Sequence, residues 1–202
     1  MSDAATADSH GVTPNYQPFG VSIGIFGMWL FLASEVMFFT GILGTYIVYR
    51  TANAEEFAKL AAENLSTLIG SINTLILITS SYTMVLAVRA CERGEGGKTR
   101  QWLLTTAALG TVFLFVKILL EYVPKYQHGH MTNPDLFFSC YFALTGVHGL
   151  HVVAGVIPLV LFALSADHLA KTKSKRVEIL GLYWHFVDLV WIFLFPLLYL
   201  VD

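Results

Sequence analysis

The stretch that decides the fold is YWHFVDLVWIFLF at residues 183–195, in which only His185 and Asp188 can carry a charge. Every other residue in it is apolar or aromatic. An ionisable group near the middle of a lipid bilayer costs at least roughly 2.5 kcal/mol, so a chain that keeps one there is expected to give it a partner inside the protein. This run therefore predicts a transmembrane helix with a protected polar face.

The composition extends this prediction to the whole chain. Of its 202 residues, 55% are hydrophobic and 13% are charged, and the mean hydropathy is +0.63, which excludes an ordinary soluble domain. Because lipid cannot satisfy backbone amides, long apolar segments must be helices. Five segments reach the roughly 20 residues that a spanning helix needs: about 19–49, 65–90, 102–123, 136–164 and 179–201. The predicted fold is an all-α polytopic membrane bundle of five transmembrane helices, joined by short connections and occupying residues 19–202.

The polar residues 1–18 contain Pro14 and Pro18 and no basic residue, so we expect a mobile tail and not a cleaved signal peptide. The charges of the connections predict an orientation, because cytoplasmic loops are rich in Lys and Arg. Two loops share eight of them: Arg89, Arg93, Lys98, Arg100, Lys171, Lys173, Lys175 and Arg176. The opposite side has three: Arg50, Lys59 and Lys125. The N-terminus is therefore expected in the cytoplasm and the C-terminus in the periplasm or exterior.

The first apolar segment carries glycines at spacings of three and four residues: Gly20, Gly24 and Gly27, then Gly41 and Gly44. Small residues at such spacing let another membrane helix approach closely. Two interpretations remain open, namely packing inside this chain and a docking face for a larger membrane subunit.

Three ionisable residues lie inside the first and third segments. Glu35 is close to the middle of the first, where desolvation favours the neutral carboxyl. It is either a proton carrier or a structural group hydrogen-bonded between helices, and in both cases it should face protein. Lys117 and Glu121 are four residues apart on one helix face and predict a structural ion pair, although this order of charges is the weaker one. Lys117 could also extend toward the outer interface.

His148 and His151 lie on the fourth segment at a spacing that could serve a metal or a haem. Either group would need further ligands at the same depth, and only His185 is otherwise inside a span. Hydrogen bonding between helices is the preferred interpretation, with the flanking glycines admitting a partner. Cys91 and Cys140 show no C-x-x-C pattern. We therefore predict no metal site, no cofactor site and no catalytic residue in this chain.

His185 and Asp188, at positions i and i+3, are expected to approach each other or to share a partner on a neighbouring helix. A proton relay would need a continuous line of polar groups across the membrane, and the sequence shows isolated polar positions instead.

Four motifs closely resemble subunit III of the haem-copper oxidases, the cytochrome c oxidase subunit 3 family. They are SEVMFF at 34–39, ERG at 92–94, TGVHGLHV at 145–152 and YWHFVDLVW at 183–191, in the family's order. The long form of that subunit has seven helices, and this chain looks like the shorter bacterial form that keeps the last five. The resemblance implies a multi-pass protein of the bacterial cytoplasmic (inner) membrane.

The resemblance also implies a function. Subunit III is a non-catalytic part of a proton-pumping respiratory terminal oxidase, which reduces oxygen to water with haems and copper held in partner subunits. It packs against subunit I, with subunit II and other respiratory subunits nearby, binds phospholipids, and supports proton uptake and turnover stability. Glu35 matches the family's buried carboxylate. The other matching polar positions are His148, His151, His185 and Asp188.

The sequence departs from the family in two places. Without the first two helices of the long form, the lipid-holding cleft is incomplete unless another subunit supplies its wall. Lys117, followed by Glu121, stands where many relatives have an uncharged residue, so the electron donor, cytochrome c or quinol, stays open. The alternatives are subunit III of a quinol oxidase, the related accessory protein of nitric oxide reductase and, more distantly, a transporter, which should show broken helices around a midplane site. No basic tract suggests nucleic-acid binding.

Overall fold

A computed structural model describes residues 22–127, 135–172 and 175–200, and all the regular structure in these ranges is helical. Five helices are long and apolar enough to cross a membrane: α1 (Ile23–Ala52), α3 (Thr67–Glu92), the continuous segment Gly96–Tyr126, α6 (Leu136–Leu164) and α8 (Lys175–Tyr199). The predicted all-α bundle with five spanning helices is therefore confirmed. The tail at 1–18 and Gly20 lie outside the described residues.

The third spanning segment is not a uniform α-helix. It consists of α4 (Gly96–Val116), the π-helix η2 (Lys117–Tyr122) and α5 (Val123–Gln127). It begins six residues before the boundary expected at 102, because helical hydrogen bonding extends through the polar residues that precede the apolar run. The hydropathy of the sequence indicates which part of a helix lies in lipid, but it does not indicate at which residue the helix begins.

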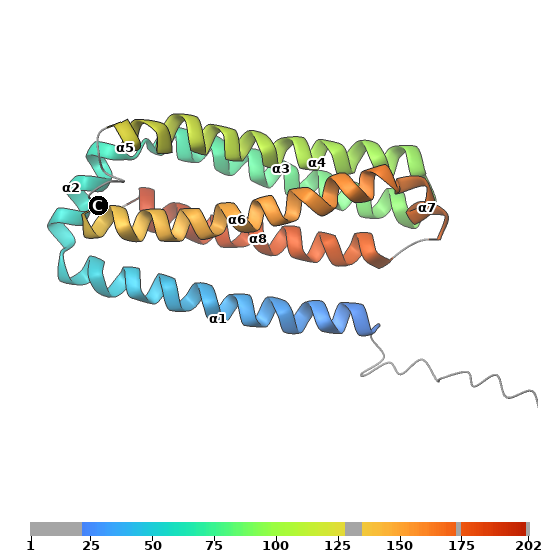
Figure 1. Ribbon diagram of the computed structural model, residues 1–202, viewed down its shortest axis with the longest axis horizontal. Helices are drawn as coiled ribbons and strands as arrows, with labels where there is room; N and C mark the ends of the chain where they lie inside the picture. The colour runs from blue at the N-terminus through green and yellow to red at the C-terminus, as the bar shows by residue number, and fades with distance from the viewer. Residues whose placement is uncertain (1–21, 128–134, 173–174, 201–202) are drawn as a thin grey trace, which may run out of the picture.

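Two connections contain short helices of their own. The helix α2 (Ala54–Asn64) lies in the first connection and buries Phe57 and Ala61, while α7 (Ala166–Lys171) lies in the last and buries Leu169. Figure 1 shows α2 and α7 at opposite ends of the bundle. They close the ends of the bundle with apolar side chains that the expected loops would not supply.

A tight turn joins α3 to α4. Gly94 has φ of 76°, a left-handed conformation that favours glycine. The next residue, Glu95, precedes α4, and its carboxylate lies 2.8 Å from the ammonium group of Lys98. This hydrogen bond lowers the pKa of Glu95 from its ordinary value. The pair is exposed at a helix start, where an acidic group is favourable but contributes little to stability.

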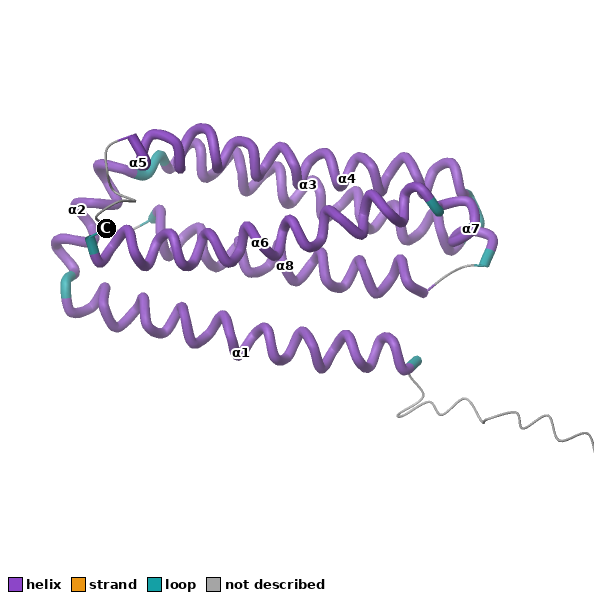
Figure 2. The backbone as a smooth tube through the Cα atoms, in the orientation of Figure 1, coloured by secondary structure: helices purple, strands orange, loops and turns teal. Residues whose placement is uncertain are grey.

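The long helices run side by side, with α1 at one edge, α6 and α8 in the middle, and α3 and α4 at the other edge (Figures 1 and 2). Burial differs strongly between them. In the most apolar 18-residue window of α1 only 11% of residues are buried, against 50% in α8. The helix α8 is therefore the centre of this bundle, and α1 leaves most of its surface to lipid or to another protein.

Trp184 of α8 explains the close approach of its neighbours. A Cβ atom added at Gly110 of α4 would lie 2.6 Å from this indole ring, and one added at Gly155 of α6 would lie 2.8 Å from it. Trp184 is fully buried. These two glycines are therefore required by packing, because a methyl group at either position would overlap the ring.

The glycines of α1 behave differently. A Cβ at Gly24 would lie 2.9 Å from Ile179 of α8, whereas no described atom lies within 4 Å of the corresponding point at Gly27, Gly41 or Gly44. Packing inside the chain therefore accounts for Gly24 alone among these four. The docking interpretation of the other three stays a prediction.

Candidate functional site

Glu35 of α1 meets His151 of α6, with 3.0 Å between Oε2 and Nε2. The other ring nitrogen, Nδ1, lies 2.9 Å from the carbonyl oxygen of Val147. Because a carbonyl only accepts hydrogen bonds, Nδ1 carries a proton, and the contact with Glu35 needs one more proton, on Nε2 or on the carboxyl group. The pair thus shares one proton and has no net charge in either form, which suits its place inside a membrane helix bundle.

The same histidine connects to α8. The hydroxyl of Tyr183 donates a hydrogen bond of 2.9 Å to the backbone carbonyl of His151, and the ring of Phe39 packs edge-on against its imidazole at 5.1 Å between centroids. This group is one polar attachment of the lightly packed α1 to the bundle; another is the Tyr46 hydroxyl, which donates a hydrogen bond of 2.9 Å to the carbonyl of Leu197 in α8.

Hydroxyl groups of α3 bind the polar atoms of α8. Ser81 Oγ lies 2.6 Å from His185 Nδ1, and Ser80 Oγ accepts from Trp184 Nε1 at 3.1 Å. About two turns away, Thr74 Oγ1 accepts from Trp191 Nε1 at 3.0 Å. Buried indole N–H groups need such partners, so this row of hydroxyls fixes the register of α3 against α8.

His185 and Asp188 do not bind each other directly, but both have Ser81 of α3 as a polar neighbour, which is the second of the two arrangements that the sequence predicted. Asp188 is 3% exposed, and neither of its oxygens makes a hydrogen bond of ordinary geometry in the described part of the chain. A buried carboxylate without a cation is costly, so Asp188 is expected to be neutral here.

Four side chains from three segments form a buried polar cluster, which we call the lysine cluster: Lys117 and Glu121 of η2, Tyr141 of α6 and Tyr199 of α8. Lys117 Nζ lies 2.7 Å from Glu121 Oε2 and 2.5 Å from the Tyr199 hydroxyl. Tyr199 and Tyr141 both donate to the same carboxylate oxygen, Tyr199 at 2.5 Å. The cluster surrounds one carboxylate oxygen of Glu121 with charge-assisted hydrogen bonds and ties three helices together, while the other oxygen, Oε1, has no partner among the described residues.

The predicted Lys117–Glu121 pair is therefore present, but Lys117 does not extend to the interface. It is 6% exposed, and its ammonium group lies 4.6 Å from the centre of the Trp191 ring. The pair lies in the π-helix η2, a local widening of the helical turn that is frequent at functional sites. The wider turn is where the chain accommodates two charged side chains pointing into the bundle.

His148 has a different environment from His151. Its ring lies between those of Phe113 and Trp191, with centroid distances of 5.7 and 5.2 Å. In the described part of the chain neither of its nitrogens has a hydrogen-bond partner, although the residue is only 1% exposed. His148 therefore does not act as the hydrogen-bonding link between helices that the sequence suggested.

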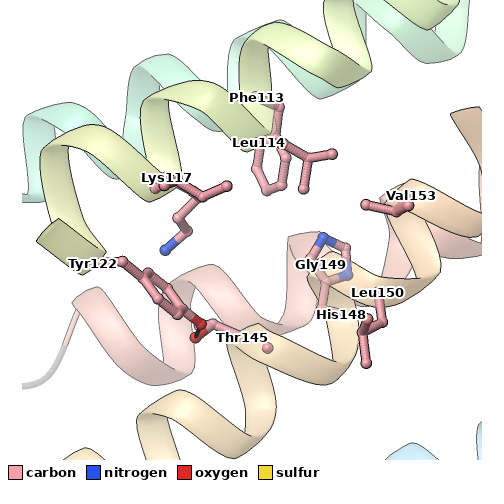
Figure 3. Close-up of a pocket in the computed structure, with 11 residues that line it drawn as sticks. Phe113, Leu114, Lys117, Tyr122, Thr145, His148, Gly149, Leu150 and Val153 are labelled. Carbon is pink, nitrogen blue, oxygen red and sulfur yellow. Dashed lines mark hydrogen bonds between the residues drawn. The ribbon is translucent and has the colours of Figure 1, made fainter. Parts of the chain in front are cut away.

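A cavity of about 200 Å³ adjoins His148 between α6 and the segment α4–η2. Figure 3 shows the imidazole on one wall and Phe113, Leu114 and Lys117 on the other, with Tyr122 and Thr145 at one end. The hydroxyls of Tyr122 and Thr145 are 2.7 Å apart and bind each other. His148 is thus the only residue of the wall, among those described, whose side-chain polar atoms all lack a partner.

Sequence reasoning did not find the hydroxyl partners: Thr74, Ser80, Ser81, Tyr141 and Tyr199. Hydroxyl residues are common in membrane helices, where they bond to the preceding turn of their own backbone, as Thr74 does to Gly70. A helical spacing of seven between Thr74 and Ser81 would have indicated one face, but nothing in the spacing identifies α8 as the partner.

These features define the chain as a multi-pass membrane protein whose ionisable side chains lie mainly between helices. Among the described residues, no group of three or more His, Cys, Asp or Glu side chains could hold a metal ion. The predicted site residues are spread over four places: Glu35 with His151, His148, His185 with Asp188, and the lysine cluster.

Comparison with known proteins places the chain more narrowly. Residues 14–202 match the family model of cytochrome c oxidase subunit III. Cytochrome c oxidase subunit 3 of Synechocystis sp. is 38% identical over 181 residues, covering 88% of this chain and 75% of that protein. Its counterpart in Alkalihalophilus pseudofirmus is 35% identical over 181 residues, covering 87% and 85%. Quinol oxidase subunit 3 of Bacillus subtilis is 33% identical over 188 residues, covering 92% and 91%.

The chain belongs to the cytochrome c oxidase subunit III family. The family includes subunits of both cytochrome c oxidases and quinol oxidases. The resemblance drawn from the four sequence motifs is thereby confirmed.

Proposed function

We propose that this chain is the non-catalytic subunit III of a proton-pumping cytochrome c oxidase in a bacterial cytoplasmic membrane. The family membership over residues 14–202 is the observation that carries this proposal. The geometry supports a structural role, because Glu35, Lys117, Glu121 and His185 are each bound to a neighbouring side chain and are not gathered around one reaction centre. Haems and copper belong to the partner subunits in this proposal.

The docking face for subunit I is the outer surface of α1. This surface exposes Gly27, Gly41 and Gly44 together with large apolar side chains such as Met37, which is 76% exposed. Glycines that have no described atom within 4 Å of the Cβ position allow the close approach of a helix from another subunit. Subunit II and other respiratory subunits complete the assembly around this contact.

Phospholipid binding is supported by a groove of about 430 Å³ beside α1, α6 and α8. Its walls include Met28, Phe31 and Pro158, and Arg176 lies on its rim. An apolar groove with a guanidinium group at its end matches an acyl chain and a phosphate. In this family role, bound lipid and the Glu35–His151 pair sustain proton uptake and turnover stability.

The orientation proposed from the basic loops places the end of α3 and the start of α4 in the cytoplasm. Gly96, where α4 begins, would have its Cβ against Asp167 of α7, so the two basic connections lie at the same end of the bundle. Arg93, Lys98 and Lys171 are therefore on one side, as the positive-inside rule requires.

Quinol is the second candidate electron donor. The observation in its favour is the 33% identity to quinol oxidase subunit 3 of Bacillus subtilis across 92% of this chain. In both cases the electron donor binds to another subunit, so this chain has the same non-catalytic role with either donor. Oxygen consumption with reduced cytochrome c or with a soluble quinol separates them.

Affinity purification of the tagged chain from its native membrane tests the proposal. We expect a large subunit that contains haem to co-purify at equal stoichiometry, and the haem to stay with that subunit after dissociation. Gly41→Leu should reduce the yield of the complex because Gly41 lies on the proposed docking face. Gly97→Leu should not, because Gly97 is exposed at the start of α4, away from that face, and no described atom lies within 4 Å of its Cβ position. A chain that purifies alone, or that retains haem or copper itself, contradicts the proposal.

A further inference from the structure

A groove between α3 and α8 leads from one end of the bundle toward the middle of the span. Its volume is about 310 Å³, and four of the eight residues that line it are ionisable: Arg89, Glu92, Glu178 and His185. The first two belong to the last turn of α3 and Glu178 to the first turn of α8, so the groove opens at the end that carries the basic connections. Charged walls with room for several water molecules, roughly 30 Å³ each, favour a hydrated groove.

His185 forms the inner end of this groove. It is the eleventh of the 25 residues of α8, and it lies about 10 Å deeper along the helix than Glu178. Its Nδ1 is 2.6 Å from the hydroxyl oxygen of Ser81. Its Nε2 makes no hydrogen bond with a described residue and is not among the atoms that are buried without a partner, so water in the groove reaches it. The imidazole therefore has one nitrogen toward the groove and the other toward Ser81.

Asp188 lies beyond Ser81, out of reach of the groove. Both of its oxygens are buried, and neither makes a hydrogen bond of ordinary geometry with a described residue. Its polar neighbour is the Ser81 hydroxyl. A hydroxyl group donates and accepts at the same time. After a small rotation of the side chains, Ser81 can accept from the protonated carboxyl while it donates to His185 Nδ1.

The polar route ends at Asp188. The next polar side chain along α8 is Trp191, and its indole N–H already donates to Thr74. An indole is a donor only, so it cannot take up a proton from a carboxyl group. Among the described neighbours, Ser81 is therefore the group through which a proton on Asp188 can leave.

We propose that His185, Ser81 and Asp188 form a proton-holding site that exchanges protons with the water of this groove alone. A proton from water binds Nε2 of His185. The Nδ1 proton then moves to the Ser81 oxygen while the hydroxyl proton of Ser81 moves to the Asp188 carboxylate. The carboxyl group is now neutral, the hydroxyl is restored, and the imidazole keeps one proton, on Nε2.

Release follows the same steps backwards. In the intermediate state the proton on His185 balances the carboxylate of Asp188, so the pair has no net charge and is less costly to bury than an isolated carboxylate. Because entry and exit share one route, the site stores a proton on one side of the membrane and does not conduct protons across it. This role goes beyond the proposed function, which assigns no proton-holding group to α8.

Infrared spectroscopy of the purified membrane preparation in heavy water tests the site. The C=O stretch of a protonated carboxyl moves to lower frequency when deuterium replaces its proton, and we expect this shift in the unmodified chain. Asp188→Asn identifies the band by removing it. A heavy carbon isotope in the aspartate carboxyl assigns the band even if that variant fails to assemble.

Variants of the route should change the rate of this shift and not the band itself. Ser81→Ala and His185→Phe should each slow it roughly a hundredfold, because each removes one positioned proton carrier. Ser81→Thr keeps the hydroxyl and should exchange at nearly the original rate. Thr74→Val is the matched control, since it removes another hydroxyl of α3 that binds a side chain of α8 but lies outside the route. Its rate should equal that of the unmodified chain.

Four results would overturn the site. Unchanged rates in Ser81→Ala and His185→Phe would mean that protons reach Asp188 by another path. Slowing in Thr74→Val as large as in Ser81→Ala would mean that helix packing sets the rate. The absence of an Asp188 band would mean that the carboxyl is ionised, and a band that never shifts would mean that the groove is dry. The band belongs to this chain whether or not an oxidase subunit co-purifies, so failure of the site is distinct from failure of the proposed function.

Discussion

The carboxylate of Glu35 lies 3.0 Å from the imidazole of His151, and this contact joins α1, the least buried spanning helix, to α6. Both side chains are about one-fifth exposed. Because the two groups share one proton, the contact is expected to survive replacement of the carboxyl by an amide, whose N–H can donate to the ring nitrogen.

Glu35→Gln should therefore leave the stability of the complex nearly unchanged, and Glu35→Ala should lower it by about 1–3 kcal/mol, because the alanine leaves His151 Nε2 without a partner. Thermal unfolding of the purified complex, with retention of this subunit as the readout, measures the difference. Equal loss in both variants would show that the pair is ionised, since glutamine cannot replace a negative charge.

Removing one charge of the lysine cluster should be more harmful than removing both. Lys117→Met leaves the buried Glu121 without its cation and should cost about 3–5 kcal/mol. The double variant Lys117→Met with Glu121→Gln should lose less than the sum of the two single variants, because neither change then leaves a buried charge. A double-mutant cycle on thermal stability gives the coupling free energy.

The exposed pair Glu95 and Lys98 is the control for that experiment. Lys98→Ala breaks an ion pair of similar length, 2.8 Å against 2.7 Å, at the surface, and it should change stability far less than Lys117→Met does. A coupling in the lysine cluster as small as this control would mean that the buried carboxylate is stabilised by Tyr141 and Tyr199 alone.

Glycine substitutions should separate positions that packing requires from positions that it does not. Gly110→Ala places a methyl group against the ring of Trp184 and should destabilise the bundle by about 1–3 kcal/mol. Gly146→Ala meets nothing closer than 3.7 Å and should be neutral or slightly stabilising, since alanine is the better helix former. Subunit yield and thermal unfolding of both variants compare them directly. A loss at Gly146 equal to that at Gly110 would mean that another molecule packs there in the assembly.

Reporter fusions test the orientation. Alkaline phosphatase, which is active only outside the cytoplasm, should be active when fused after Asp202 and inactive when fused after Lys171. The expectation follows from the eight basic residues of the two connections at one end of the bundle. The opposite pattern of activity would invert the topology without changing the fold.

Some of the polar contacts could be predicted from the sequence and others could not. The Lys117–Glu121 pair follows from a spacing of four residues within one helix. The partners of Glu35 and His185 are His151 and Ser81, which lie 116 and 104 residues away along the chain. A spacing rule applies within a helix, so it carries no information about which helix becomes the neighbour.

The sequence alone determined the number of spanning helices, the all-helical fold and the family. Apolar length and the exclusion of unpaired backbone from lipid leave no alternative to helices, and motifs persist locally along the chain. Only the tertiary structure decided that Trp184 needs Gly110 and Gly155, that His151 binds Glu35, and that His148 has no hydrogen-bond partner among the described residues. The physical reason is that these contacts depend on the rotation and depth of one helix against another, which side chains from several helices fix together.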